Sequence, residues 1–311
     1  MLSKVAERVY WTARYIERIE STARMISIYD KLLFDLPRVV KITWYNLIVI
    51  NSLESDFSDR YSVRDERNVV KFLIADDNNP GSIVSSLTAI RENIRTTRDV
   101  VLEETWEQVN ELHMMVTHHL KDGVNRSSRH EFLESIIKGC HQIQGLLYGN
   151  MPQDAAWDFL SIGRSLERAD MTTRNLDAAM AAVIDLEGDE NAINSEQIIW
   201  GNSLRSLNSG QSYQRTIRAS VYSKLVVDYL INNEQLPRSI DFCLSSMHGS
   251  ASNLPKSKKV IAAIKKLQKN ACIDITDELL GDPLREHLND IQVSLNELHL
   301  LISQTWFPTV E

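Results

Sequence analysis

Apolar residues recur at the i, i+3, i+4 spacing of amphipathic helices along most of the 311-residue chain. Prolines stand just before six of these stretches, as expected for a residue tolerated only in the first helical turn: Pro37, Pro80, Pro152, Pro237, Pro255 and Pro283. Glycines fall where the spacing lapses, and we expect helix ends and turns there: Gly123, Gly149, Gly188, Gly210, Gly249 and Gly281. The pattern predicts an all-α, multi-helix bundle of about ten to twelve helices without an appreciable sheet.

One stretch, DLEGDENAINS at 185–195, is polar and contains glycine, which is typical of a link between helical groups. It is equally compatible with an ordinary surface loop. The sequence therefore predicts a single helical domain over residues 1–311, or two packed halves at 1–187 and 196–311.

A charged helix occurs twice in the chain. Residues 13–24, ARYIERIESTAR, match residues 163–174, GRSLERADMTTR, at an offset of 150. The type and order of the charged side chains recur, so that Arg14, Glu17, Arg18, Glu20, Thr22 and Arg24 correspond to Arg164, Glu167, Arg168, Asp170, Thr172 and Arg174. We expect the two helices to lie close together with pseudo-twofold character and arginine–carboxylate pairs between them.

Each copy has an apolar stripe and, on the other side, a charged arc. The stripe of the first copy runs from Val5 to Ile26, and that of the second from Phe159 to Leu176. The arcs are either solvated, laced with weak ion pairs, or half-buried against each other or a shared cleft. The ordered recurrence favours burial, which requires pairing because an unpaired buried charge is costly.

A buried charged arc has two interpretations, which the sequence does not separate. It is a structural lattice of ion pairs, or some of its arginines are free to bind a carboxylate or phosphate. In the second case Glu17 and Glu167 are the candidates for proton transfer. The candidate anion or substrate ligands are Arg14, Arg18, Glu20, Arg24, Arg164, Arg168, Asp170 and Arg174.

A third Arg/Glu group follows the helix start at Pro80. Arg91, Glu92 and Arg95 either join the same polar cluster or lie on a solvated helix face, and we include them among the candidates. The chain contains no HExxH or ExxH pattern, no P-loop and no Gly-rich dinucleotide turn. We therefore expect no metal site and no cofactor bound by a recognisable motif.

Charge and cysteine content narrow the classes of partner and compartment. The net charge of −8 argues against a general nucleic-acid binder or a binder of anionic membranes. Three cysteines without CxxC spacing argue against a disulfide framework, and the N-terminus lacks the apolar region of a signal peptide. No apolar run approaches the ~18 residues of a membrane span. The composition predicts a soluble, cytoplasmic protein.

Six further segments are distinctive: MLSKVAERVYWTARYIERIESTAR (1–24), FLIADDNNPGSI (72–83), AIRENIRTTRD (89–99), WEQVN (106–110), WDFLSIGRSLERADMTTRNLD (157–177) and LPRSI (236–240). Through these segments the chain resembles the bacterial alpha-E domain family along most of its length. The resemblance implies an all-α protein encoded beside, or fused to, a circularly permuted ATP-grasp protein and a transglutaminase-like protein.

These associated proteins suggest ATP-dependent amide or peptide bond formation, in which the ATP-grasp partner uses the ATP. The leading hypothesis is a helical partner of an ATP-grasp-type ligase whose Arg/Glu face binds the ligase or an acidic small molecule or peptide. One alternative is a stand-alone enzyme acting on an amide or peptide through its glutamates. A second alternative is a structural helical oligomer.

Overall fold

The computed structural model describes residues 1–35, 42–186 and 192–308. Within these ranges it contains fifteen α-helices, one 3-10 turn and no strand, which confirms the predicted all-α class. The sequence predicted ten to twelve helices, and the excess consists of three helices of five residues each: α2 (Asn46–Ile50), α3 (Glu54–Ser58) and α7 (Leu120–Val124). The others are α1 (Ser3–Asp35), α4 (Glu66–Ile74), α5 (Ile83–Arg95), α6 (Glu103–His118), α8 (Arg126–Asn150), α9 (Ala155–Ile184), α10 (Ala192–Ser206), α11 (Gly210–Ile217), α12 (Ser223–Asn232), α13 (Ile240–Asn253), α14 (Lys258–Ala271) and α15 (Asp282–Trp306).

Proline was the more reliable marker of helix boundaries. Five of the six prolines stand at or just before helix starts, at α5, α9, α13, α14 and α15, whereas Pro37 lies outside the described residues. The glycine prediction is wrong for Gly249, which lies inside α13, whereas Gly123 and Gly149 each stand one residue before a helix end, in α7 and α8. Gly188 also falls outside the described residues. A glycine inside a helix costs only about 1 kcal/mol relative to alanine, so it marks an end less strictly than proline does.

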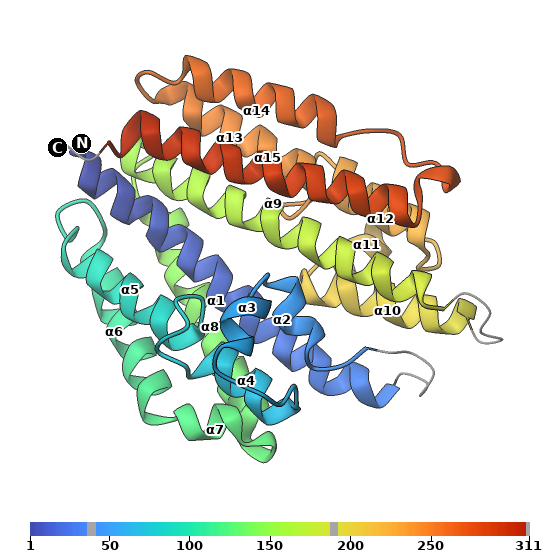
Figure 1. Ribbon diagram of the computed structural model, residues 1–311. Helices are drawn as coiled ribbons and strands as arrows, with labels where there is room; N and C mark the ends of the chain where they lie inside the picture. Colours follow the sequence, from blue (N-terminus) through green and yellow to red (C-terminus); the bar gives the residue numbers. More distant parts are fainter. Residues whose placement is uncertain (36–41, 187–191, 309–311) are drawn as a thin grey trace.

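Two long helices, α1 and α9, pack side by side through the centre of the molecule, and we call their contact the α1–α9 crossing (Figure 1). Helix α1 packs against α5 and α8, and α6 covers those two helices. Helix α9 packs in the same way against α13 and α15, which α14 covers. The two groups follow the same order along the chain, which indicates that the whole fold, and not only the charged helix, is duplicated.

A second repeat in the sequence supports this duplication. Residues 69–83, VVKFLIADDNNPGSI, match residues 226–240, VVDYLINNEQLPRSI, at seven of fifteen positions and an offset of 157. The repeat covers the end of α4 and of α12 and the start of α5 and of α13. In both copies a serine, Ser82 or Ser239, caps the following helix by accepting a hydrogen bond from a backbone N–H three residues on.

The division between the halves lies between α8 and α9. The sequence offered a link near residues 187–196 as one possibility beside a single domain, whereas the contacts group α9 with α13 and α15, which follow that link. Residues 187–191 of the predicted link lie outside the described residues, and α10 already begins at Ala192. The polar composition of this stretch marks a connection within the second half.

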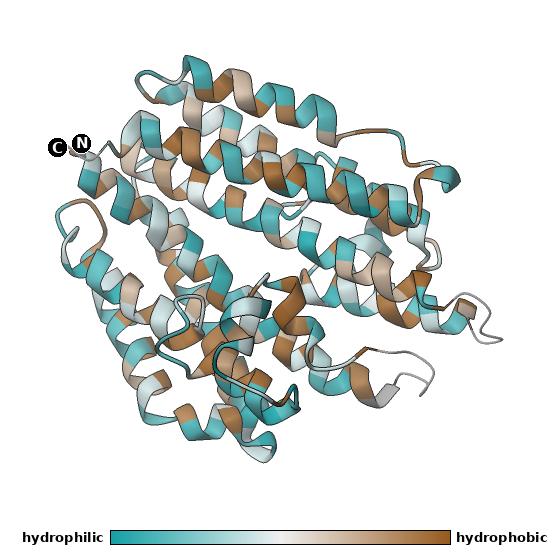
Figure 2. Ribbon diagram, in the orientation of Figure 1, coloured by the Kyte–Doolittle hydropathy of each residue, from teal (hydrophilic) through white to brown (hydrophobic). Residues whose placement is uncertain are grey.

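The crossing of α1 and α9 is close because one partner contributes a glycine. A Cβ at Gly163 would clash with the backbone carbonyl of Tyr10. The helices around this crossing carry apolar and polar positions side by side (Figure 2), and their apolar stripes form a continuous core. Because other helices cover α1 and α9 on several sides, their charged arcs are buried along with their apolar stripes.

Candidate functional site

The duplicated Glu–Arg pairs bind each other across the α1–α9 crossing. Arg18 Nε lies 2.7 Å from Glu167 Oε1, and the corresponding Arg168 Nη2 lies 2.6 Å from Glu17 Oε1. Both carboxylates are 1% exposed. These contacts confirm that the two arcs face each other and form reciprocal arginine–carboxylate pairs, because each copy donates to the other.

Glu167 is held by two arginines of α1. Arg14 Nε donates to Oε2 at 2.7 Å, and Arg18 occupies Oε1. Burial alone would raise the pKa of Glu167, but the charges of Arg18 and Arg14 outweigh it and lower the pKa to about 2. A carboxylate that stays ionised and has both oxygens occupied is poorly suited to proton transfer near neutral pH. The geometry therefore gives the catalytic interpretation of Glu167 no support.

Glu17 is buried in a similar cage on the other side of the crossing. Besides the pair with Arg168, its Oε2 lies 3.4 Å from Arg238 Nη1, and Gln144 Nε2 donates to its Oε1 at 3.1 Å. Arg238 precedes α13, and Gln144 belongs to α8, so Glu17 ties together four segments of the chain. These contacts fit a structural anchor.

Glu20 lies one turn further along α1, and three side-chain nitrogen atoms lie within hydrogen-bonding distance of its Oε1. These are Arg24 Nη2 at 2.7 Å, Arg238 Nη2 at 3.0 Å and His141 Nε2 at 3.2 Å. Burial raises the pKa of Glu20, but the hydrogen bond from His141 and the charges of Arg238 and Arg24 lower it well below its usual value. Its counterpart Asp170 pairs with Arg174, at 2.9 Å and at a more exposed position.

The third Arg/Glu group does not join this cluster. Arg95 and Glu92 pair with each other on the surface at 2.8 Å, with both side chains more than half exposed. Arg91 donates to Asn110 and lies over the ring of Trp106. These three residues therefore belong to the solvated face of α5, which was the other interpretation of their spacing.

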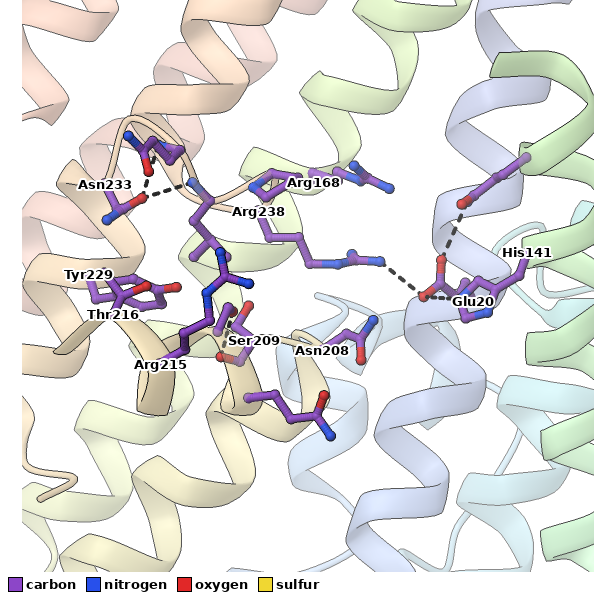
Figure 3. A pocket seen from close by; sticks show the side chains of 16 residues that line it. Glu20, His141, Arg168, Asn208, Ser209, Arg215, Thr216, Tyr229, Asn233 and Arg238 are labelled. Atoms are coloured by element: carbon purple, nitrogen blue, oxygen red, sulfur yellow. Dashed lines mark hydrogen bonds and ion pairs between the residues drawn. The ribbon is translucent and has the colours of Figure 1, made fainter. Parts of the chain in front are cut away.

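One side of the paired arcs opens into a cleft of about 670 Å³, shown in Figure 3. Arg168, Arg238 and Arg215 of α11 line it, and in Figure 3 they lie across from Glu20 and His141. Glu20 is the one carboxylate among the described residues that line the cleft. We call this space the arginine cleft. Its remaining lining is mostly polar and uncharged, from Ser209, Thr216, Tyr229, Asn233 and neighbouring residues.

The sequence interpretation missed Arg238, Arg215, His141 and Gln144. A signal for Arg238 was present, because LPRSI repeats the PGSI of the first half and places Arg238 where that half has Gly81. A charged side chain that replaces glycine at an equivalent helix start is a visible departure from the duplication. Arg215, His141 and Gln144 carry no comparable signal, since each lies on a helix that only the tertiary fold brings to α1 or α9.

The reciprocal Glu–Arg pairs agree with the comparison with known families. A family described as a predicted alpha-helical domain with a conserved ER motif matches residues 1–307, and an adjacent Glu–Arg occurs in each copy of the duplicated helix. The chain belongs to the Alpha-E family. The resemblance inferred from the sequence is thus confirmed over essentially the whole chain.

Curated relatives of this Alpha-E protein are considerably longer. An uncharacterised protein of Mycobacterium bovis and one of Mycobacterium tuberculosis are each 21% identical over 323 aligned positions, covering 94% of this chain and 35% of the relative. The chain therefore spans about a third of the length of these relatives. No solved structure matches.

Within the described ranges, none of the helices of this Alpha-E protein combines the length and the apolar character needed to cross a bilayer. In the same ranges, no three or more His, Cys, Asp or Glu side chains gather in a way that could hold a metal ion. The chemistry that the described site offers is therefore that of arginine side chains, buried carboxylates and hydrogen-bonding groups.

Proposed function

We propose that this Alpha-E protein is an accessory subunit of an ATP-grasp-type amide or peptide ligase, and that its arginine cleft binds a carboxylate of an acidic, peptide-like substrate. The observation that carries the proposal is the convergence of Arg168, Arg215 and Arg238 on one cleft with a single, already occupied carboxylate. Guanidinium groups bind carboxylates with two parallel hydrogen bonds, so this lining suits an anionic ligand.

The balance of charge around the crossing supports an anionic ligand. Three glutamates, Glu17, Glu20 and Glu167, pair with five arginines, an excess of two positive charges in a protein whose net charge is −8. The arginines are Arg14, Arg18, Arg24, Arg168 and Arg238, and Arg215 adds a further positive charge to the cleft. A lattice that served only to connect helices would need no such excess.

The partner in this proposal is the one that the family resemblance implies. The circularly permuted ATP-grasp protein would use ATP and form the bond, and a transglutaminase-like protein would act in the same pathway. The mycobacterial relatives support a partner, because about two thirds of each relative lies outside the match and could hold a further unit joined to the matched one. Because the paired arcs are internal, the cleft is the part of the charged cluster that a substrate could reach.

A reconstitution experiment tests the proposal. The chain would be combined with a circularly permuted ATP-grasp protein of the kind that the family resemblance implies, and ATP-dependent amide formation would be measured with glutamate-containing peptides. We expect formation to need both proteins and to fall about tenfold or more with Arg215→Ala, since one charged hydrogen-bonding partner contributes about 1.5–3 kcal/mol. Arg215 is exposed, so its removal should leave folding intact.

The matched control is Arg98→Ala, an exposed arginine stacked on Trp106 away from the cleft. It should leave amide formation unchanged. Equal rates with and without the chain would refute the accessory role. Turnover by the isolated chain would instead favour a stand-alone enzyme.

A further inference from the structure

Arg164 departs from the symmetry of the duplicated helices. Its counterpart Arg14 forms a 2.7 Å ion pair with Glu167, whereas Arg164 forms no ion pair within residues 1–35, 42–186 and 192–308. The acid in the corresponding position, Glu17, instead accepts at Oε1 from Arg168 and Gln144, and its Oε2 lies 3.4 Å from Arg238. The second copy thus holds an arginine for which the protein supplies no carboxylate.

An aromatic side chain positions this arginine. The Arg164 guanidinium lies over the ring of Tyr148, 3.6 Å from its centroid, and Tyr148 Oη donates to the carbonyl of Leu160. The hydroxyl bond fixes the ring, and the ring holds the guanidinium in place through a cation–π contact. The side chain is therefore ordered by groups that leave its hydrogen-bond donors available.

Two buried donors at this corner have no acceptor within the described part of the chain, Arg164 Nε and Trp157 Nε1. Trp157 meets the edge of Tyr148, with ring centroids 6.4 Å apart, so both donors lie around the same ring. Burial lowers the pKa of Arg164, and the neighbouring charge of Arg168 acts in the same direction. A half-buried cation whose buried Nε donor is unmet is costly unless an anion or acceptor completes it.

Arg164 also lies next to the arginine cleft. It stands four residues before Arg168 on α9, so the two side chains emerge from the same helix face about 6 Å apart. Arg168 lines the cleft. A ligand with several carboxylates could therefore occupy the cleft with one of them and reach the corner formed by Arg164, Tyr148 and Trp157 with another.

We propose that Arg164, held on Tyr148 beside the unpaired Trp157 donor, is a second carboxylate anchor, so that the site selects an elongated polyacidic ligand such as an oligoglutamate chain over a single acidic residue. This inference rests on the proposed function for the anion in the cleft. It adds a preference for ligand length. The first anchor is the cleft around Arg215 and Arg238, and the second is the corner at Arg164.

The test is a binding titration with glutamate and with tetraglutamate, using wild-type protein, Arg164→Gln and Arg215→Ala. Wild type should bind tetraglutamate more tightly than glutamate. Arg164→Gln should weaken tetraglutamate binding about tenfold and leave glutamate binding unchanged. Arg215→Ala should weaken both. Arg164→Lys, which keeps the charge but loses the planar fork, should recover only part of the affinity.

Thermal unfolding separates an anchor from a structural role. Because the protein leaves its charge uncompensated, Arg164→Gln should unfold at the wild-type temperature or above it. Arg98→Gln, also stacked on an aromatic ring, is the control that should change neither binding nor unfolding.

The possible results separate the second anchor from the proposed function. Unchanged tetraglutamate affinity in Arg164→Gln, or a clear fall in its unfolding temperature, would overturn the second anchor while leaving the cleft in place. Failure of wild type to bind either ligand would overturn both. A length preference that depends on Arg164, without any stimulation of a ligase, would sustain the anchor and refute the accessory role.

Discussion

The two halves of the molecule use the same Glu–Arg pair but surround it differently. In the first half, Arg14 and Arg18 both bind Glu167, and the helix start equivalent to that of α13 carries Gly81. In the second half, Arg168 binds Glu17 together with Arg238, and Arg164 is left on Tyr148. The features that the halves share hold the crossing together. The features that differ form the arginine cleft and its neighbouring corner.

This comparison teaches how a duplicated fold can acquire a site without losing its core. The reciprocal pairs satisfy the charges at the centre, where an unpaired group would be most costly. An additional arginine at position 238 then pairs with Glu17 and supplies one of the three nitrogen atoms around Glu20 Oε1. Arg164 thereby remains without a carboxylate, and the positive excess faces the cleft rather than the crossing.

The largest effect is expected when Glu167 is removed from the reciprocal Glu–Arg pairs that the two halves share. Glu167→Ala would strand Arg14 and Arg18 and should destabilise the protein by about 3–5 kcal/mol in denaturant unfolding. Arg18→Ala should cost only about 1 kcal/mol, because Arg18 is a quarter exposed and Glu167 keeps Arg14. Similar losses in the two variants would contradict the view that Glu167 is the buried member on which both arginines depend.

The next effect concerns the crossing itself. Gly163→Ala would push a methyl group against the Tyr10 carbonyl and should destabilise by about 1–3 kcal/mol, despite the better helix propensity of alanine. Gly145→Ala is the matched control in α8, where nothing lies within 4 Å of an added Cβ. That variant should be up to about 1 kcal/mol more stable than wild type. If both alanines stabilise, the helices do not approach as closely as described.

The sequence indicated the shared features better than the differences. Helical spacing and proline placement predicted the class and most helix starts, because these depend on local geometry. The charged repeat predicted that the arcs of α1 and α9 meet, since a recurring order of charges needs a partner. It could not tell that Arg14 would be paired and Arg164 unpaired, because that depends on Gln144, Tyr148 and Arg238 from other helices. Composition likewise could not distinguish the buried Glu20 from the exposed Glu92.

The smallest predicted effect is a pH dependence where α15 of the second half meets α1 of the first. His299 of α15 stacks on Tyr10, and its Nδ1 lies 2.8 Å from the Tyr10 hydroxyl. Arg14 donates to that hydroxyl, which leaves the hydroxyl hydrogen for Nδ1 and fixes the neutral imidazole as an acceptor. Burial, aided by the charge of Arg14, lowers the pKa of His299 from 6.5 to about 4.

The sign of the effect follows from proton uptake. Between about pH 6.5 and pH 4 the unfolded chain binds a proton at His299 that the folded chain does not, so stability should fall as the pH is lowered through this window. His299→Gln should flatten the dependence of the unfolding temperature between pH 7 and pH 5. The fall at lower pH, down to about pH 2, should remain because there the unfolded chain protonates Glu167 while the folded chain resists it. An unchanged slope above pH 5 in His299→Gln would show that another group titrates there, and that the neutral His299–Tyr10 contact does not distinguish the surroundings of Arg14 from those of Arg164.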